Sequence, residues 1–268
     1  FTQSDVQVAA NYADLFIPFF KNNEIRNMLL SFANREGTHQ RAYALLNDTL
    51  GLDEAEYSAF LEYDEMKEKL EFMKSGGGHY RGAEEMAMAL AVSTINEGIG
   101  LFSAFVMLLN YQRFGKMKGM GQIVTYSIRD ESLHVEAMTK LFREFIQENI
   151  EIWTDDFKAE LYQICREMVE LEDKFLDLVF QFGDMKGLTK KDMYAYNRYI
   201  ADRRLLQLGL KTNFDQRDNP LPWLDEVLGV EHQNFFEGRA TAYMKAGLRG
   251  KQDKITFTEI QNAQSNGS

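Results

Sequence analysis

The sequence predicts an all-α protein, a helical bundle with a dinuclear metal site in its four-helix core. The chain of 268 residues has only 3 prolines, a composition typical of long uninterrupted helices. Two expected helices each carry a Glu-x-x-His motif, Glu36 with His39 and Glu131 with His134. Residues three apart share a helix face, so each motif can bind one metal ion. Two such helices, with one carboxylate from each of two further helices, form the dimetal centres of four-helix bundles.

The helices are expected in a regular order along the chain. Pro18 can kink or end the first helix, Gly51 suits the C-terminal cap of the second, and a triple glycine ends the third. The expected helices cover residues 4–20, 23–50, 53–74, 82–114, 121–148, 155–182, 190–210, a short segment near 223, and 234–246. Residues 1–248 are therefore predicted to form one helical domain, and the polar residues 249–268 a disordered tail.

Composition and charge exclude several classes of function. The net charge is −11 and no basic run is present, which argues against nucleic acid and anionic membranes as partners. The most apolar stretch, residues 86–109, is interrupted by Asn96 and Glu97, which favours a core helix over a membrane span. No segment resembles a signal peptide. The single cysteine, Cys165, rules out an internal disulfide and favours a reducing compartment, so we expect a cytoplasmic protein.

Glu97 and Glu131 each lie within an apolar stripe of their helix. A carboxylate is costly to bury unless a cation compensates its charge. Two divalent metal ions would do so, since they accept carboxylate and imidazole ligands. The alternative is an acid paired with arginine or placed at the edge of the stripe, and it stays open for Glu97 alone. Glu97 together with both motifs favours the metal site.

Two further residues allow more than one interpretation. Asp5 shares an inward face with Tyr12, but Ser4 or Asp5 could instead cap the first helix, and the spacing slightly favours the cap.

Tyr43 shares a helix face with Glu36 and His39, with its ring expected about 6 Å along the axis from His39. A metal-bound oxidant could reach its phenol from there. Without the metal motif, an ordinary core tyrosine would be favoured.

These residues resemble a known family, the radical-generating small (beta) subunit of class I ribonucleotide reductase in the ferritin-like superfamily. The resemblance covers nearly the whole chain. The segments that carry it are residues 1–5 (FTQSD), 35–43 (REGTHQRAY), 96–97 (NE), 129–134 (RDESLH), 197–204 (NRYIADRR) and 234–238 (NFFEG).

The resemblance implies a role for each candidate residue. It places Asp5, Glu36 and His39 on one metal ion and Glu97, Glu131 and His134 on the other, with Glu36 and Glu131 bridging the two. It moves Asp5 from a cap to a ligand and places Tyr43 at the radical-tyrosine position. Asp130 matches an acid that holds a metal-bound histidine and lies on the radical relay, with a solvated surface charge as the alternative.

Two departures from the family pattern concern the relay. Family members carry a tryptophan-bearing segment before the first ligand, whereas this sequence has only Trp153 and Trp223. Members also end in a tail with a relay tyrosine, and no tyrosine follows Tyr243 here. We therefore expect that residues are missing from the sequence at both ends.

The implied function is a small subunit of ribonucleoside-diphosphate reductase. Its centre, two Mn or two Fe ions per chain with mixed Mn/Fe possible, would be activated by an oxygen species. It would generate a tyrosyl radical or a high-valent cluster that the large catalytic subunit uses to make deoxyribonucleotides. The short interval from Glu36 to Glu97 resembles compact, class Ib-like or related dimanganese forms, which often need a flavodoxin-like activator. A homodimer is also implied.

Other functions on the same scaffold remain open. A stand-alone dimetal oxidase or hydroxylase would need a substrate pocket beside the metals. The non-enzymatic alternative is metal storage or a purely structural bundle, but storage proteins use short, separate four-helix units and lack the segment from residue 197 to 238.

Overall fold

The computed structural model describes residues 2–53, 55, 62–75 and 82–227. Along these residues the chain forms helices and no β-strand, apart from one isolated bridge between Met185 and Leu188. The all-α prediction is confirmed. Contacts divide the chain into a unit of Phe1–Pro222 and a second unit, Trp223–Ser268, which is described only as far as residue 227. The expected helix at 234–246, the boundary at 248 and the expected tail lie outside the described residues.

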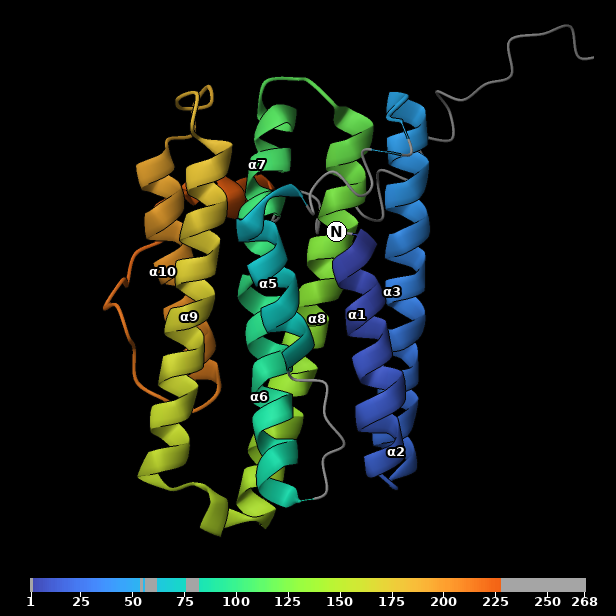
Figure 1. The fold of residues 1–268 in the computed structure, drawn as a ribbon, viewed down its shortest axis with the longest axis vertical. Coiled ribbons are helices and arrows are strands. Elements are labelled where there is room, and N and C mark those ends of the chain that lie inside the picture. Colours follow the sequence, from blue (N-terminus) through green and yellow to red (C-terminus); the bar gives the residue numbers. More distant parts are fainter. Residues whose placement is uncertain (1, 54, 56–61, 76–81, 228–268) are drawn as a thin grey trace, which may run out of the picture. The chain divides into compact units, whose positions relative to one another are not determined.

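The longer helices of the first unit run roughly along a common direction (Figure 1). In order they are α1 (Thr2–Asn11), the π-helical segment η1 (Tyr12–Phe16), α2 (Ile17–Phe19), α3 (Asn23–Leu50), α5 (Asp64–Ser75), α6 (Ala83–Ile99), α7 (Phe102–Arg113), α8 (Lys118–Glu148), the short 3₁₀ turn η3 (Ile150–Ile152), α9 (Asp155–Val179) and α10 (Lys190–Gln207).

Helix α3 has the bounds that the sequence predicts, because both of its ends carry a specific cap. The Asn22 side chain accepts hydrogen bonds from the backbone N–H groups of Glu24 and Ile25. At the other end Gly51 adopts the left-handed conformation with φ 70°, which a glycine enters without steric cost. These caps fix the helix that carries Glu36 and His39.

The expected helix at 82–114 is interrupted, and this part of the prediction is wrong. The chain turns at Gly100 and Leu101, which separate α6 from α7. Arg204 of α10 donates from Nε to the carbonyl oxygen of Gly98 at 3.0 Å, so this carbonyl has a side-chain partner at the break. A Cβ at position 98 would lie 2.5 Å from Arg204 Nε, so only glycine leaves room for this contact. Helix α6 therefore ends two residues after Glu97.

The segment before α3 is helical from residue 2 to 19, with a wide turn near Pro18. Pro18 has no N–H to continue the α-helical ladder, and the N–H of Ile17 bonds to the carbonyl of Tyr12, five residues back. The helical segment ends at Phe19, one residue after Pro18, as the sequence allowed, and the π-helical segment η1 precedes the proline. It directs the side chains of Tyr12 and Phe16 into the core, where both are buried.

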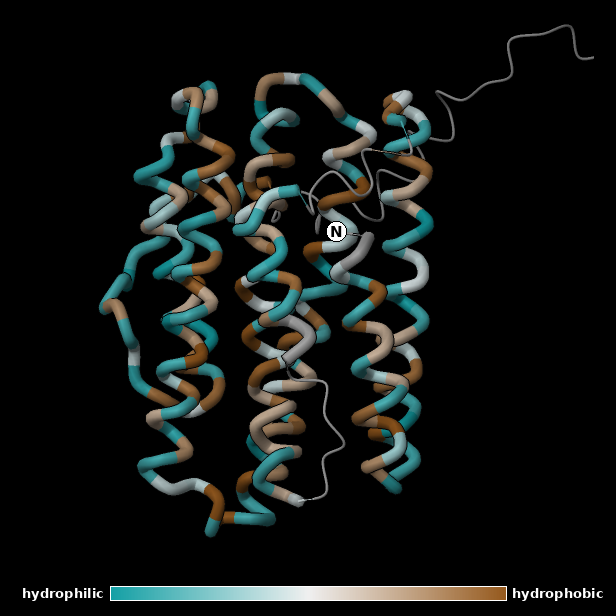
Figure 2. The backbone as a smooth tube through the Cα atoms, viewed as in Figure 1, coloured by the Kyte–Doolittle hydropathy of each residue, from teal (hydrophilic) through white to brown (hydrophobic). Residues whose placement is uncertain are grey.

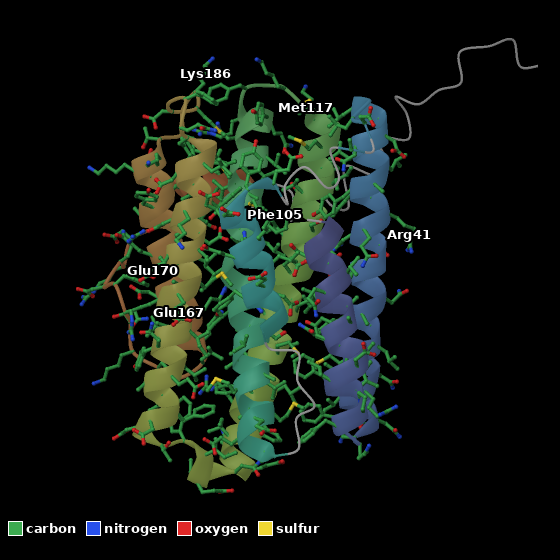
Figure 3. All side chains as sticks on the ribbon, viewed as in Figure 1. Arg41, Phe105, Met117, Glu167, Glu170 and Lys186 are labelled. Carbon is green, nitrogen blue, oxygen red and sulfur yellow. The ribbon has the colours of Figure 1, made fainter. Side chains whose placement is uncertain are left out.

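The apolar core follows α6 and α7, where hydrophobic colour predominates in Figure 2. The stretch Ala83–Arg113 is long and apolar enough to cross a membrane by composition, but 83% of its most apolar window is buried within the protein. This burial is what a core helix requires. Other charged residues lie at the surface, as the side chains of Arg41 on α3 and Glu170 on α9 illustrate (Figure 3).

Candidate metal centre

Four helices bring the six predicted ligands into one buried cluster. Each of these side chains belongs to a residue that is at most 4% exposed: Asp5 of α1, Glu36 and His39 of α3, Glu97 of α6, and Glu131 and His134 of α8. Asp5 lies within α1 and faces inward, so the alternative that it caps this helix is wrong. The arrangement matches the dimetal pattern of two Glu-x-x-His helices and two helices with one carboxylate each.

The cluster contains two overlapping groups of potential ligand atoms. Atoms of Asp5, Glu36 and His39 lie within 4.8 Å of one another, and atoms of Glu36, Glu97, Glu131 and His134 do the same. Each group has the size expected for one ion. Glu36 belongs to both groups, so the two positions are adjacent.

Two carboxylates reach both histidines. Glu36 places Oε2 3.3 Å from His39 Nδ1 and Oε1 3.0 Å from His134 Nδ1. Glu131 places Oε1 3.3 Å from His39 Nδ1 and Oε2 3.7 Å from His134 Nδ1. Each of these glutamates therefore presents one oxygen toward either half of the cluster, the geometry that a bridging ligand needs.

Several atoms that face the centre of the cluster have no hydrogen-bond partner although they are buried. They are Asp5 Oδ2, Glu36 Oε1, Glu131 Oε2 and His134 Nδ1. His134 Nδ1 is near Glu36 Oε1, but the two atoms do not form a properly directed hydrogen bond. A buried polar atom without a partner costs about 1–3 kcal/mol, so four together call for a binding partner. Metal ions, which bind lone pairs from oxygen and nitrogen, fit this set.

The charges of the cluster also fit two divalent cations. Four carboxylates carry four negative charges, which two divalent ions balance if the imidazoles are neutral. The ion pairs described for these carboxylates involve histidines and neither lysine nor arginine. Elsewhere in the protein a buried acid has such a partner, since Glu172 lies 2.5 Å from Lys69 Nζ. The alternative that Glu97 is paired with arginine is not supported by its described contacts.

The protonation of the cluster without metal reflects the cost of burying like charges. Burial raises the pKa of Glu131 to about 8, and burial with the nearby Glu36 raises the pKa of Asp5 to about 7. Burial lowers the pKa of His134, but its contacts with Glu36 and Glu97 outweigh this and raise it to about 10. Protons thus take the place of cations, and metal binding must displace them.

Asp130 lies beside the cluster rather than on a solvated surface. Its Oδ2 is 3.4 Å from His39 Nε2, the ring nitrogen opposite to the one that faces the carboxylates. Arg35 and Arg129 each lie 3.4 Å from the same carboxylate. Burial opposes ionisation of Asp130, but His39 and the two arginines lower its pKa below the usual value. An ionised Asp130 can hold His39 with Nδ1 directed to a metal ion.

Tyr43 lies next to the same histidine. It is 4% exposed, and its ring centroid is 6.4 Å from that of His39, close to the expected separation. Its phenol donates a hydrogen bond to Ser127 Oγ of α8 at 2.6 Å. Burial raises the pKa of Tyr43 well above its usual value, so the phenol keeps its proton at neutral pH.

Comparison with known proteins identifies the family to which this chain belongs. Residues 1–220 match the family described as ribonucleotide reductase, small chain. The chain belongs to this family. It is 41% identical to the probable ribonucleoside-diphosphate reductase small subunit 376L of Invertebrate iridescent virus 6, over 98% of this chain and 82% of the relative. It is 31% identical to the ribonucleoside-diphosphate reductase subunit beta of Chlamydia pneumoniae, over 92% and 75%.

A solved structure supports the fold assignment. The ribonucleotide reductase R2 subunit from Clostridium botulinum superimposes with a TM-score of 0.78 at 22% identity, covering 85% of this chain and 73% of that one. The predicted ferritin-like helical bundle is confirmed.

In this small-chain family member, two residues at the cluster carry contacts that the sequence did not assign to the site. The Tyr12 phenol donates to both oxygens of Glu97, at 2.9 and 2.8 Å, and Ser93 Oγ donates to Glu97 Oε1 at 2.7 Å. Helical periodicity could have indicated that both side chains lie near the predicted ligands. Tyr12 shares the inward face of Asp5, and Ser93 lies one helical turn before Glu97. The pattern at Tyr12 does not indicate its partner, because Glu97 lies on another helix.

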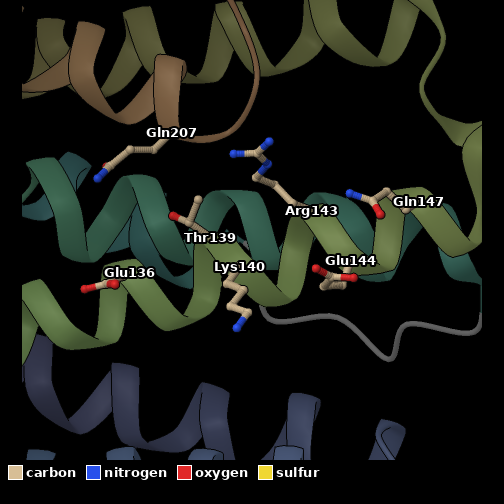
Figure 4. A pocket seen from close by; sticks show the side chains of 7 residues that line it. All are labelled: Glu136, Thr139, Lys140, Arg143, Glu144, Gln147 and Gln207. Atoms are coloured by element: carbon tan, nitrogen blue, oxygen red, sulfur yellow. The ribbon is translucent and has the colours of Figure 1, made fainter.

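A surface groove of about 330 Å³ is separate from the cluster. It is lined by polar side chains, six from α8 and one from α10: Glu136, Thr139, Lys140, Arg143, Glu144, Gln147 and Gln207 (Figure 4). None of the six predicted ligands lines it. This groove therefore gives no support to the alternative of a stand-alone oxidase, which needs a substrate pocket beside the metals.

Proposed function

We propose that this chain is the small subunit of a ribonucleoside-diphosphate reductase and binds two metal ions through Asp5, Glu36, His39, Glu97, Glu131 and His134. The observation that carries the proposal is the position of Glu36 and Glu131, each of which directs one oxygen to each histidine. In this arrangement Asp5 and His39 complete one ion position, and Glu97 and His134 the other. When bound and activated by an oxygen species, the ion pair supplies an oxidant beside Tyr43.

The surrounding residues control orientation and protons. Asp130 would accept a hydrogen bond from the Nε2–H group of His39 and so keep Nδ1 free to bind metal. The Tyr43 phenol holds its proton in the hydrogen bond to Ser127. A radical on Tyr43 would require this proton to leave, so the hydrogen bond to Ser127 would have to be broken or rearranged.

The metal and the partners follow from family membership together with the donor set. Carboxylates and imidazoles accept both Mn and Fe, so either pair or a mixed pair suits the cluster. We propose a large catalytic subunit and a second copy of this chain as protein partners. A flavodoxin-like activator is proposed for a dimanganese form. The reaction would take place on the large subunit, where the oxidising equivalent stored here would initiate the radical chemistry and a separate reductant would supply the two electrons that reduce the ribonucleotide.

The test combines metal content with an electron paramagnetic resonance (EPR) measurement. Protein loaded with Mn(II) or Fe(II) should hold two ions per chain and, once activated, show a tyrosyl signal broadened by nearby metals. Tyr43→Phe removes only the phenol oxygen, so it should abolish this signal and leave metal content unchanged. A signal that survives in Tyr43→Phe would mean that the ions keep the oxidising equivalent themselves.

The assignment as a reductase subunit is tested separately. The protein with a matching large subunit should support reduction of ribonucleoside diphosphates, and neither subunit should do so alone. Turnover of an organic substrate by this chain without a partner would favour the oxidase instead.

A further inference from the structure

Glu97 differs from the other predicted ligands because donors from two elements hold its carboxylate. Oε1 accepts hydrogen bonds from Ser93 Oγ at 2.7 Å and from the Tyr12 phenol at 2.9 Å. Oε2 lies 2.8 Å from the same phenol and 3.3 Å from His134 Nδ1. The two oxygens are therefore not equivalent. Both oxygens accept from the Tyr12 phenol, but only Oε1 also accepts from Ser93, and only Oε2 lies next to His134, which belongs to the same ion position.

The Tyr12 ring is fixed by aromatic neighbours, so its phenol is a rigid donor. Tyr12 is fully buried, and its ring packs against Phe16 at 5.9 Å, Phe32 at 5.8 Å and His134 at 6.1 Å between centroids. The contact with His134 is edge-on, with 80° between the ring planes. Moving the phenol away from Glu97 would disrupt this packing and leave a buried O–H without its partner.

The backbone at Tyr12 is adapted to this position. Tyr12 is the first residue of the π-helical segment, and its carbonyl accepts the hydrogen bond of Ile17, five residues later. A π-helical turn rotates the residues that follow it relative to a regular helix, and such turns are frequent at functional sites. Asp5, on the same N-terminal helix, belongs to the other ion position. This helical segment therefore contributes to both halves of the cluster.

We infer that Tyr12 is a positioning residue that, together with Ser93, holds Glu97 with Oε2 toward the ion at His134 and Oε1 turned away. A carboxylate held in this way would offer Oε2 to the ion at His134, while Oε1 stays engaged by Ser93. Charge-assisted hydrogen bonds to a ligand carboxylate are the kind of outer contact that fixes ligand geometry. This role presupposes the metal centre proposed above.

The test is anaerobic Mn(II) binding, followed by competition with a chelating dye and by low-temperature EPR. Tyr12→Phe keeps the ring and removes only the donor. It should bind the ion at His134 on the order of 10–100-fold more weakly, and its EPR spectrum should change because Glu97 can rotate. Ser93→Ala should have a smaller effect of the same kind, since the phenol still holds both oxygens. Tyr162→Phe serves as a matched control, because the Tyr162 oxygen accepts from the backbone N–H of Lys211 instead of binding a cluster residue.

Each outcome decides one point. Native affinity and a native spectrum in Tyr12→Phe would overturn the role of Tyr12, as would a loss no larger than that of Tyr162→Phe. If Tyr12→Phe does not fold, 3-fluorotyrosine at position 12 takes its place, because it keeps the ring and makes the phenol a stronger donor; a native affinity and spectrum there would overturn the role of Tyr12. Failure of the unmodified protein to bind two Mn(II) ions would instead refute the metal centre itself, so the two failures are distinguishable.

Discussion

Metal binding should raise the melting temperature, and the size of the increase should depend on which carboxylate is changed. A ligand that binds only the folded state at 100 times its dissociation constant stabilises it by about 2.7 kcal/mol. Two independent ions would give about twice that value. For a helical unit of this size, each kcal/mol shifts the melting temperature by about 2–4 °C. Saturating Mn(II) should therefore raise the melting temperature by roughly 10–20 °C relative to the same protein in chelator.

The positions of the carboxylates predict how much of this rise in melting temperature each variant should lose. Asp5 belongs only to the group with Glu36 and His39, so Asp5→Asn should remove about half of the increase. Glu131 lies within 3.7 Å of both histidines, so Glu131→Gln should remove nearly all of it. Glu170→Gln is the matched control, because Glu170 is an exposed acid on α9 (Figure 3).

The assay is calorimetry or circular dichroism melting of each variant, with chelator and with Mn(II). Equal increases in Asp5→Asn and Glu131→Gln would refute the distinction between terminal and bridging carboxylates. An unchanged increase in both variants would refute the ligand assignment.

Two further predictions concern protons and packing. In chelator, the raised pKa values of Asp5 (about 7) and Glu131 (about 8) mean that the folded chain binds more protons than the unfolded one above about pH 4. The melting temperature should therefore fall as the pH rises to about 8, less steeply in Glu131→Gln; a melting temperature that rises with pH would contradict this. Gly98→Ala should lower the free energy of unfolding by about 2–5 kcal/mol in chemical denaturation, because the added Cβ displaces Arg204 from the Gly98 carbonyl. Gly119→Ala, on α8 where a Cβ meets no atom within 4 Å, is the control, and equal stability of the two variants would count against this account.

Much of the fold was predictable because its determinants are local. The caps Asn22 and Gly51 set the bounds of α3, and helical periodicity placed Glu97 and Glu131 on buried faces. The Glu-x-x-His spacing is itself local, since one helix supplies both ligands. For Asp5, local spacing favoured a cap, and the family resemblance indicated the inward position that the structure has.

The features that sequence analysis missed depend on contacts between distant segments. The break after α6 is associated with Arg204, which is 106 residues from Gly98. The partners of Tyr12 and Tyr43 are Glu97 and Ser127, separated from them by 85 and 84 residues. Single-chain periodicity indicates which face of a helix is buried, but not which side chain of another helix it meets.

The distribution of the ligands along the chain also has a consequence for the order in which the protein assembles. One ligand group, Asp5 with Glu36 and His39, lies within the first 39 residues, on α1 and α3, which pack against each other. The other group requires Glu97 and the α8 residues Glu131 and His134. Closing a short loop costs less chain entropy than closing a long one. A chain in which only α1 and α3 have folded would thus already bring together three ligands of one ion position, whereas Glu131, which faces both positions, and the remaining ligands Glu97 and His134 would be added only after α8 has packed against α6.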